Sequence, residues 1–212
     1  MEKIVIVGAG GFGREVAWLI DRINSKEKKY EIIGFADDNK VIGEAIGNSK
    51  VIFTIDELCN YSDNLSVCVA IGNAKVRKQI IDKLLRNSNI SFPNLIDPSV
   101  IYSTDEVKMG VGNIICAGTI MTVNISIGDF NIINLDCTIG HDDIINNYIT
   151  IYPSVNVSGC VVIGNCTEIG TGTQIIQGLS IASDSIIGAS AAVVKNLIES
   201  GTYVGVPARR IK

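Results

Sequence analysis

Hydrophobic residues recur every six positions through the second half of the chain. From Met109 to Val193 every sixth residue is aliphatic or methionine, and the pattern holds for fifteen consecutive positions. The residue after this position is often glycine, and the fifth residue of the unit is often small. A period of six matches neither the 3.6-residue period of a helix nor a free strand, so it indicates a structural repeat. We expect each unit to form a short strand and a corner, with three units closing a triangular coil of about eighteen residues around its apolar positions.

The first hundred residues instead alternate apolar runs with amphipathic segments, as in an α/β domain. Strands are predicted at 4–7, 31–36 and 66–71, and helices at 14–24, 54–58 and 74–87. Residues 40–52 are glycine-rich and expected to be irregular, and residues 90–96 close this part of the chain. We therefore divide the chain into an α/β domain of residues 1–96 and a repeat domain of residues 97–212.

A glycine-rich turn lies between the first strand and the first helix. The run from Gly8 to Gly13 has the spacing G-x-G-x-x-G, whose glycines allow a tight turn and whose following helix offers free N–H groups to a phosphate. The next strand ends at Asp37 and Asp38, where a ribose or base would lie. About 95 residues suffice for one mononucleotide-binding half of a doubly wound sheet, so a nucleotide or nucleotide sugar fits better than a dinucleotide. The alternative is a small domain whose glycines only shape turns.

Composition narrows the partners. The net charge of −4 and the isoelectric point near 5.0 give no electrostatic basis for binding nucleic acid or an anionic membrane. No apolar run approaches the length of a membrane span, and no signal-peptide pattern opens the chain, so we expect a cytoplasmic protein. The six cysteines form no Cys-x-x-Cys pair. They are interpreted as small buried residues in a reducing compartment, without a disulfide framework or a metal site.

The single histidine, His141, lies inside the repeat. It is the third residue of its hexad, which places it near a corner and off the inward column, and it is followed by Asp142 and Asp143. An imidazole is suited to accepting a proton at neutral pH. A neighbouring carboxylate can fix its tautomer and raise its basicity. This arrangement favours a general base over a structural residue.

The hexads resemble those of the hexapeptide-repeat acyltransferases, whose repeats wind a left-handed parallel β-helix. Fifteen hexads, at three to a coil, predict about five coils here. The segment Ile139-Gly140-His141-Asp142, with Asn134 upstream, is similar to the catalytic segment of one subgroup. That subgroup contains the UDP-4-amino-sugar N-acetyltransferases of the bacillosamine pathway and the sialic-acid O-acetyltransferases. It joins a small Rossmann-like nucleotide-sugar domain to a β-helix, the architecture expected here.

The resemblance also implies roles for individual residues. His141 would be the general base, Asp142 would orient it and Asn134 would lie beside the acceptor. The nucleotide sugar would contact Gly8, Gly10, Gly11, Asp37, Asp38 and Lys40, with Gly72 and Asn73 nearby. Acetyl-CoA, the expected co-substrate, would lie between two β-helices of a homotrimer, near Gly159, Thr150, Ala189 and Arg209.

Two positions depart from the family pattern. Members often have a second histidine nine residues after the first, where this chain has Thr150. Many also have Ile-His-Pro before the coils, where this chain has Ile96-Asp97-Pro98. The first departure puts in doubt a role for a second histidine near the thioester. It leaves the base in place.

Gly159 lies eighteen residues, one full coil, beyond His141 and is expected to stack beside it. Without a side chain it would leave room for pantetheine and present its amide to the oxyanion of acyl transfer. The alternative is a corner glycine that the turn itself requires.

The leading hypothesis is therefore acetyl transfer from acetyl-CoA to a UDP-linked 4-amino sugar. O-acetylation of sialic acid or another sugar is the alternative within this class. A nicotinamide-dependent oxidoreductase and a non-catalytic sugar-binding β-solenoid are alternatives from other classes. A carbonic anhydrase on the same coil is excluded, because its zinc needs three histidines and this chain has one.

Overall fold

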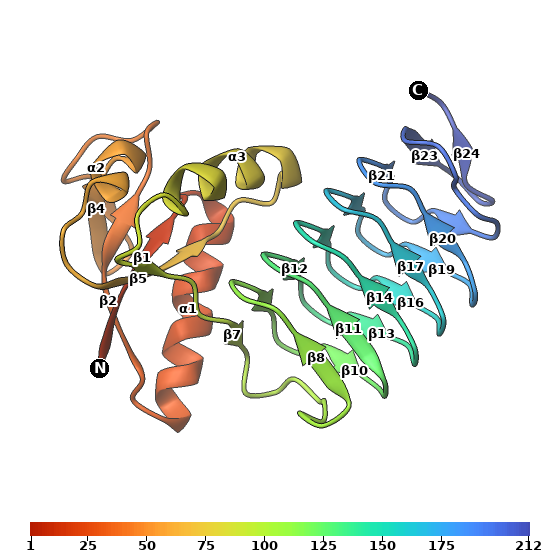
Figure 1. Cartoon of the computed structure of the whole chain (residues 1–212), viewed down its shortest axis with the longest axis horizontal. Helices are drawn as coiled ribbons and strands as arrows, with labels where there is room; N and C mark the ends of the chain where they lie inside the picture. The colour runs from red at the N-terminus through yellow and green to blue at the C-terminus, as the bar shows by residue number, and fades with distance from the viewer. The chain divides into compact units, whose positions relative to one another are not determined.

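The computed structural model describes residues 1–212, which form two compact units, Met1–Pro98 and Ser99–Lys212. The expected boundary lies two residues earlier, after residue 96. Figure 1 shows an α/β arrangement in the first unit and stacked coils in the second. The expected fold class, a small α/β domain followed by a parallel β-helix, is confirmed. No helix has the length and apolar character needed to cross a bilayer.

The first unit contains one sheet with strand order β3-β4-β2-β1-β5-β6. Its pairs are parallel except for the antiparallel pair of β3 with β4. The strands are β1 (Glu2–Val7), β2 (Tyr30–Ala36), β3 (Ala45–Ile46), β4 (Ser49–Phe53), β5 (Leu65–Val69) and β6 (Ile90–Ser91), with the short β7 (Leu95–Ile96) at the end of the unit. β5 is buried at every residue and β1 at its last four, as expected of strands covered on both faces.

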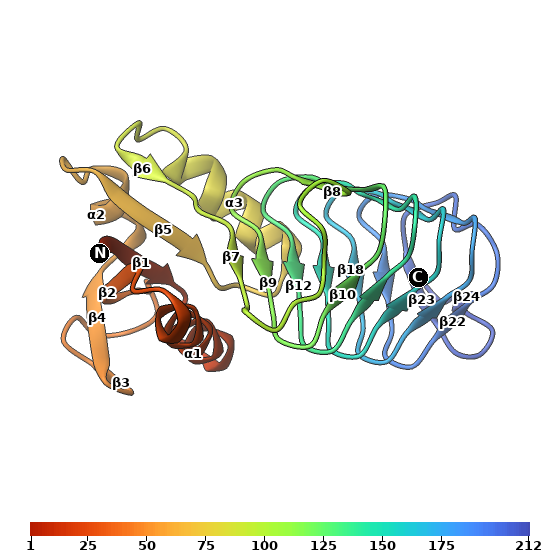
Figure 2. The same ribbon diagram turned by 90° about the horizontal axis from the view of Figure 1, so that it is seen from below.

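Three helices cover this sheet, α1 (Gly11–Lys26), α2 (Ile55–Cys59) and α3 (Ala74–Leu84). The β1–α1–β2 and β5–α3–β6 connections run outward in opposite directions, so right-handed crossovers place α1 and α3 on opposite faces (Figure 2). α2 packs against α3. The strand order reverses between β1 and β5, and ligands of such sheets bind at this switch point, outside the carboxyl ends of the strands.

Local chemistry explains most of these boundaries. Thr54 caps α2 through a capping box with Glu57, as the sequence predicts for its start. α1 begins at Gly11 rather than at the expected residue 14. The segment 40–52, expected to be irregular, contains the β3–β4 hairpin, whose turns use Gly43 and Gly47 with positive φ. Alternation in so short a hairpin is too weak to recognise from the sequence.

Asp97, one of the two positions that depart from the pattern expected from the resemblance, has a structural partner. Its carboxylate is fully buried and accepts two hydrogen bonds from Arg22 of α1, with Nε–Oδ2 and Nη2–Oδ1 distances of 2.5 and 2.9 Å. This bidentate pair fixes the end of the first unit to its first helix.

In the second unit, strands three apart in sequence pair in parallel and form three faces. Face I contains β10 (Ile120–Met121), β13 (Thr138–Ile139), β16 (Asn156–Val157), β19 (Gln174–Ile175) and β22 (Ala192–Val193). Face II contains β8 (Val107–Met109), β11 (Ile125–Ile127), β14 (Ile144–Ile145), β17 (Val162–Ile163) and β20 (Ser180–Ile181). Face III contains β9 (Ile114–Ile115), β12 (Ile132–Ile133), β15 (Thr150–Ile151), β18 (Glu168–Ile169), β21 (Ile186–Ile187), β23 (Thr202–Val204) and the antiparallel β24 (Arg209–Arg210).

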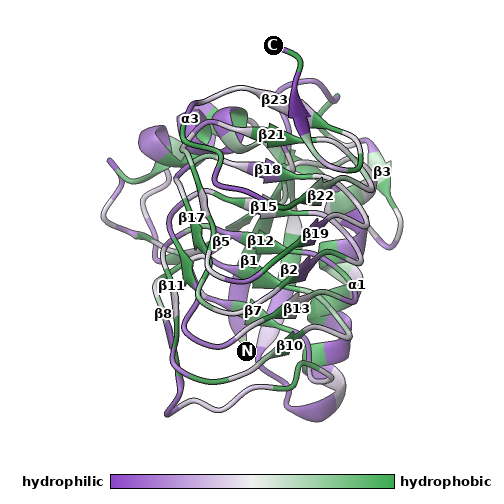
Figure 3. Cartoon of the chain, turned by 90° about the vertical axis from the view of Figure 1, so that its right-hand side faces the viewer, coloured by the Kyte–Doolittle hydropathy of each residue, from purple (hydrophilic) through white to green (hydrophobic).

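From β8 to β22 the paired strands of successive coils are eighteen residues apart, whereas β21 and β23 pair with a spacing of sixteen. Met121 pairs with Ile139 and Ile139 with Val157, so equivalent positions of successive coils stack. The sixth-residue column is buried almost throughout, and Figure 3 shows hydrophobic colour along many of the strands. Each buried aliphatic side chain stabilises the fold by roughly 1.5–3 kcal/mol. The predicted interior column is therefore confirmed from Ile115 to Val193, and Met109 at its start is only partly buried.

The corners have a feature that the sequence analysis did not anticipate. The fourth residue of most hexads has a left-handed backbone. Asp142 has φ 62° and Cys160 has φ 59°, and ten non-glycine residues of the coils share this conformation. Four corner glycines, residues 112, 118, 172 and 178, adopt it as well. The corner therefore turns at its fourth position, and the third position, that of His141, projects beside the turn.

Candidate functional site

His141 and Asp142 form a hydrogen-bonded pair at the corner between faces I and II. Nδ1 of His141 lies 2.8 Å from Oδ2 of Asp142, and both side chains are about half exposed. Asn124, one coil earlier, donates from Nδ2 to Oδ1 of the same carboxylate at 2.6 Å. The hydrogen bond from His141, and then that from Asn124, lowers the pKa of Asp142 below its ordinary value.

This pairing sets the chemistry of the imidazole. A carboxylate only accepts hydrogen bonds, so Nδ1 of His141 carries the ring proton of the neutral form and Nε2 is left with a free lone pair. Nε2, the only acceptor nitrogen of this tautomer, is therefore available to a substrate. A general base with an orienting acid needs such a pair, and these roles of His141 and Asp142 stay predictions.

Gly159 lies directly beneath the imidazole. A Cβ added at Gly159 would stand 2.4 Å from Nε2 and 2.5 Å from Cε1 of His141. The backbone there is not left-handed, because the left-handed residue of this corner is Cys160. The turn does not require glycine at 159, but the ring does. The sequence analysis expected the vacant space to admit pantetheine, whereas the imidazole fills it and Gly159 is buried.

Cys160, at the fourth position of its hexad, was expected to be buried and is exposed, and Cys59 and Cys166 are only partly buried. Cys68, Cys116 and Cys137 are buried as expected, and all six thiols are free. Ligand atoms of His141, Asp142 and Cys160 lie within 4.8 Å of one another. Two of these residues, His141 and Asp142, are already joined by a hydrogen bond, and we assign no metal to the group.

The other expected residues of the repeat lie elsewhere on the coil. Asn134 and Ala189 both lie at corners between faces III and I, so one chain does not bring them to the His141 corner. Asn134 is 8% exposed, and its Oδ1 accepts from the N–H of Leu135. Thr150 lies in β15 of face III and is buried, and Arg209 is exposed in β24. Their expected contacts with acetyl-CoA stay predictions.

In the first unit the glycines of the predicted turn divide into two kinds. Gly8 has φ 99° and Gly13 packs against it, since a Cβ at Gly13 would stand 1.9 Å from the Gly8 carbonyl oxygen. A Cβ at Gly10 or Gly11 would meet nothing within 4 Å. The first pair therefore builds the turn, and the second pair presents bare backbone at the start of α1, where N–H groups favour an anion.

Asp37 and Asp38 are part of the framework of this site. Asp37 Oδ2 accepts from Ala9 N at 2.8 Å and its Oδ1 accepts from Asn39 N, so it ties the glycine turn to the end of β2. Asp38 Oδ1 accepts from Ile55 N at the start of α2. Lys40 Nζ lies 2.5 Å from Glu44 Oε1 and forms an ion pair.

Two adjoining hollows surround the turn. One, of about 360 Å³, is lined by Gly8, Gly10, Gly11, Asp37 and Asp38 together with apolar side chains of α2 and α3. The other, of about 320 Å³, includes Gly10, Gly11, Lys40 and also Arg14, a cation of the first helical turn that the sequence analysis missed. Its place directly after the glycine motif was the available signal. Gly72 and Asn73 line neither hollow; Asn73 caps α3 and Gly72 O accepts from Arg77.

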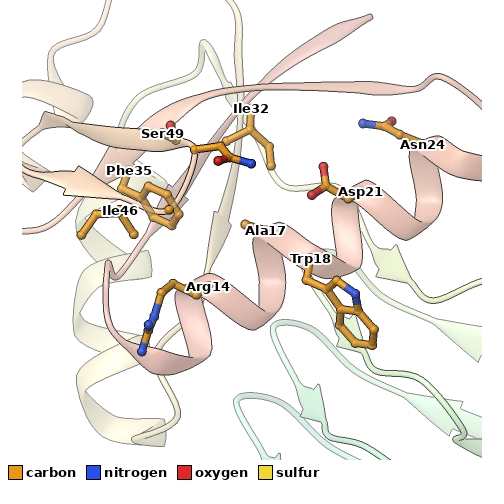
Figure 4. A pocket seen from close by; sticks show the side chains of 11 residues that line it. Arg14, Ala17, Trp18, Asp21, Asn24, Ile32, Phe35, Ile46 and Ser49 are labelled. Carbon is orange, nitrogen blue, oxygen red and sulfur yellow. The ribbon is translucent and has the colours of Figure 1, made fainter.

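A wider hollow of about 410 Å³ lies between α1 and the β3–β4 hairpin. In Figure 4, Trp18 and Asp21 project from α1, and Ile32 and Phe35 come from the sheet opposite. It shares Arg14, Ile46 and Gly47 with the hollow beside the glycine turn. It has none of the glycines of that turn, so we assign it no role in nucleotide binding.

Comparison with known proteins now adds to this geometry. Residues 3–84 match the family model of the PglD N-terminal domain. The structure superposes on WeeI from Acinetobacter baumannii AYE with a TM-score of 0.88 and 30% identity, over 100% of both chains. The chain belongs to the hexapeptide-repeat sugar acetyltransferases. The expected family and enzyme class are thus confirmed.

Two further structures of this acetyltransferase family carry ligands. The acetyltransferase domain of PglB from Neisseria gonorrhoeae FA1090, in complex with acetyl coenzyme A, is 28% identical over 99% of both chains, with a TM-score of 0.90. A histidine-to-asparagine variant of perosamine N-acetyltransferase from Caulobacter crescentus, in complex with CoA and GDP-perosamine, is 25% identical. It matches 100% of this chain and 98% of its own, with a TM-score of 0.88. The expected co-substrate, acetyl-CoA, agrees with these complexes.

Proposed function

We propose that this acetyltransferase transfers an acetyl group from acetyl-CoA to the amine of a UDP-linked 4-amino-4,6-dideoxy sugar, for surface glycan synthesis in the cytoplasm. The observation that carries the proposal is the corner pair. Nδ1 of His141 is held by Asp142, which is itself held by Asn124, and Nε2 retains a free lone pair. A histidine variant of the perosamine enzyme, crystallised with CoA and GDP-perosamine, supports a histidine at the centre of the reaction.

The reaction needs a group that accepts a proton from the amine and a group that donates a hydrogen bond to the oxyanion. The sugar amine attacks the thioester carbonyl, Nε2 of His141 takes the proton that the amine loses, and Asp142 stabilises the imidazolium. The C–S bond then breaks, and the imidazolium returns the proton to the departing thiolate. The expected donor to the oxyanion is the N–H of Gly159, for which the chain supplies no acceptor. A positioned base of this kind contributes about 10²–10⁴-fold to the rate.

The nucleotide is assigned to the hollows around the glycine turn. Bare N–H groups at Gly10 and Gly11, with Arg14 and Lys40 beside them, suit a diphosphate. Asp38 faces the neighbouring, largely apolar hollow and already uses Oδ1 for Ile55. Its remaining oxygen complements the single ring N–H of uracil better than the two adjacent donors of guanine. This supports UDP here, although the perosamine enzyme was solved with a GDP sugar.

We propose that the enzyme works as a homotrimer with sites between subunits. His141, Asp142 and Gly159 occupy corners between faces I and II, whereas Asn134 and Ala189 occupy corners between faces III and I. One chain cannot combine both corners in a single site, but two adjacent copies can. Arg209, exposed near the end of the coil, would then meet a phosphate of coenzyme A.

A free-thiol assay tests the function. Wild type, with acetyl-CoA and a panel of UDP-, dTDP-, GDP- and CMP-linked amino and hydroxy sugars, is expected to release thiol fastest with a UDP-linked 4-amino sugar. His141→Ala should lower kcat at least 100-fold. Asn165→Ala, at the same hexad position on the corner between faces II and III, is the matched control and should keep wild-type turnover. More than about a tenth of wild-type turnover in His141→Ala would overturn the role of the base.

Complementation tests the trimer. Homotrimers of His141→Ala alone and of Asn134→Ala alone should each be impaired. Coexpression of the two should restore part of the activity, because some interfaces then combine two intact corners. No restoration in mixed trimers, verified by light scattering and differential tags, would refute a site shared between copies.

A further inference from the structure

One ionisable residue beside the base has no part in the proposed reaction. Asp143 follows Asp142 and occupies the fifth position of its hexad, which faces the interior of the coil and is fully buried. Equivalent buried positions along the coil hold asparagine, threonine, serine or apolar residues, for example Asn113, Asn131 and Ile149. Among them Asp143 is the one carboxylate. A buried carboxylate is costly, so its two oxygens need an explanation.

Both oxygens accept backbone hydrogen bonds, and the two donors belong to different coils. Oδ2 accepts from Gly140 N at 2.9 Å, within the corner that carries His141. Oδ1 accepts from Val161 N at 2.8 Å, at the end of the corner that carries Gly159. One carboxylate thus joins the corner of the base to the corner on which its ring rests.

Asparagines at the same hexad position show what is particular about the acid. Oδ1 of Asn113 accepts from Asn131 N, eighteen residues on, just as Oδ1 of Asp143 accepts from Val161 N. The amide of Asn113, however, donates to the carbonyl of Gly128 in the next coil. The second oxygen of Asp143 instead turns back and accepts from Gly140 N.

The corner held in this way sets the position of the imidazole. Gly140 immediately precedes His141, and the carbonyl of His141 accepts from Cys160 N at 2.7 Å. Gly140 also packs against the backbone of Gly159, where a Cβ would stand 2.5 Å from the amide nitrogen. Burial raises the pKa of Asp143 to about 7, against the lowering effect of its two N–H donors.

We propose that Asp143 is a positioning residue for the base. Its carboxylate fixes the Gly140–His141 backbone so that Nδ1 meets Asp142 while Nε2 stays above Gly159. The role in catalysis rests on the proposed function, whereas the role in holding the ring does not.

Asp143→Asn is the decisive variant. By the precedent of Asn113, the new amide should accept from Val161 N and donate to the carbonyl of Ser158, which leaves Gly140 N–H without its acceptor. The coil should fold, but the His141 corner should loosen. Thr167→Val is the matched control, because it removes another buried hydrogen bond from the same hexad position, Oγ1 to the carbonyl of Ala182, at the corner between faces II and III.

The chain has a single histidine, so nitrogen NMR of ¹⁵N-histidine-labelled protein reports this ring alone. Wild type and Thr167→Val should give the spectrum of the Nδ1–H tautomer, and Asp143→Asn should shift both ring nitrogens toward a mixture of tautomers. With a competent substrate, kcat should fall at least tenfold in Asp143→Asn, with both KM values within about twofold. An unchanged ring spectrum in a folded Asp143→Asn would overturn the proposal. A changed spectrum with wild-type kcat would confirm that Asp143 positions the His141 ring but refute His141 as the general base. The two hypotheses are thus tested separately.

Discussion

Gly159→Ala tests whether the position of the His141 ring against Gly159 matters for catalysis, without changing other residues of the site. The added Cβ would stand 2.4, 2.5 and 2.7 Å from Nε2, Cε1 and Cδ2 of His141. Ordinary carbon contacts lie at about 3.5–4.0 Å, so the ring must move by about 1 Å. The ring is half exposed and can swing toward solvent, and the fold should tolerate the change at a cost of about 1 kcal/mol or less. A misplacement of about 1 Å in a catalytic group costs on the order of 10²-fold in rate.

We therefore expect kcat for thiol release to fall about 100-fold, with the melting temperature within about 4 °C of wild type. The KM for the nucleotide sugar should not change. Gly164→Ala is the control, because its Cβ would stand 2.4 Å from the backbone nitrogen of Ser183, a clash of equal closeness away from the base. Gly164→Ala should lose stability and keep kcat.

A double-mutant cycle sharpens this prediction. In a His141→Ala background, Gly159→Ala should have almost no further effect on kcat, because the group that it displaces is gone. Half or more of wild-type kcat in the single variant, or full additivity in the pair, would refute the reasoning.

Three other outcomes can be measured directly. The pKa of Asp143 is raised from 3.8 to about 7 on folding, so its contribution to stability is complete below pH ~4 and lost as pH rises through about 7. In urea titrations the unfolding free energy of wild type relative to Asp143→Asn should therefore fall by up to about 4 kcal/mol from pH 4 to pH 8, and a constant difference would contradict it. Asp37→Ala removes the hydrogen bonds from Ala9 N and Asn39 N that hold the glycine turn. It should raise the KM for the nucleotide sugar at least tenfold and leave the KM for acetyl-CoA unchanged. Steady-state kinetics with each substrate varied in turn measure both values. Maleimide labelling followed by mass spectrometry should modify Cys160 in the folded protein and spare Cys68 and Cys137. Burial raises the pKa values of these two thiols to about 12 and about 11, so little reactive thiolate is present. Early labelling of either buried thiol would contradict the packing.

The interior of the repeat was predictable because one rule governs every coil. The column from Met109 to Val193 follows from spacing alone, and stacking at eighteen residues placed Gly159 beside His141. The same rule applied to Asp142 reaches Asn124 upstream and Cys160 downstream, both of which the sequence analysis left unused. The eighteen-residue spacing of the corners could therefore have predicted both neighbours of Asp142 from the sequence.

Other features depend on backbone geometry that no periodicity encodes. The left-handed fourth position turns Cys160 outward, against the expectation that it is buried. The second oxygen of Asp143 finds Gly140 only because the corner folds back on itself. In the first unit, the glycine motif identified the turn between β1 and α1 correctly. The framework role of Asp37 becomes visible only when Ala9 and the end of β2 meet.

The interior of the coil repeats every six residues, whereas each corner recurs on the same edge only every eighteen residues. A deletion of six residues returns every aliphatic side chain to the axis, so the core alone cannot detect it, yet all later corners rotate by one third of a turn. A deletion of eighteen preserves every corner and shortens the spiral by a single step of about 4.8 Å. Core packing therefore tolerates insertions or deletions in multiples of six residues. Only the side chains at the corners restrict them to multiples of eighteen.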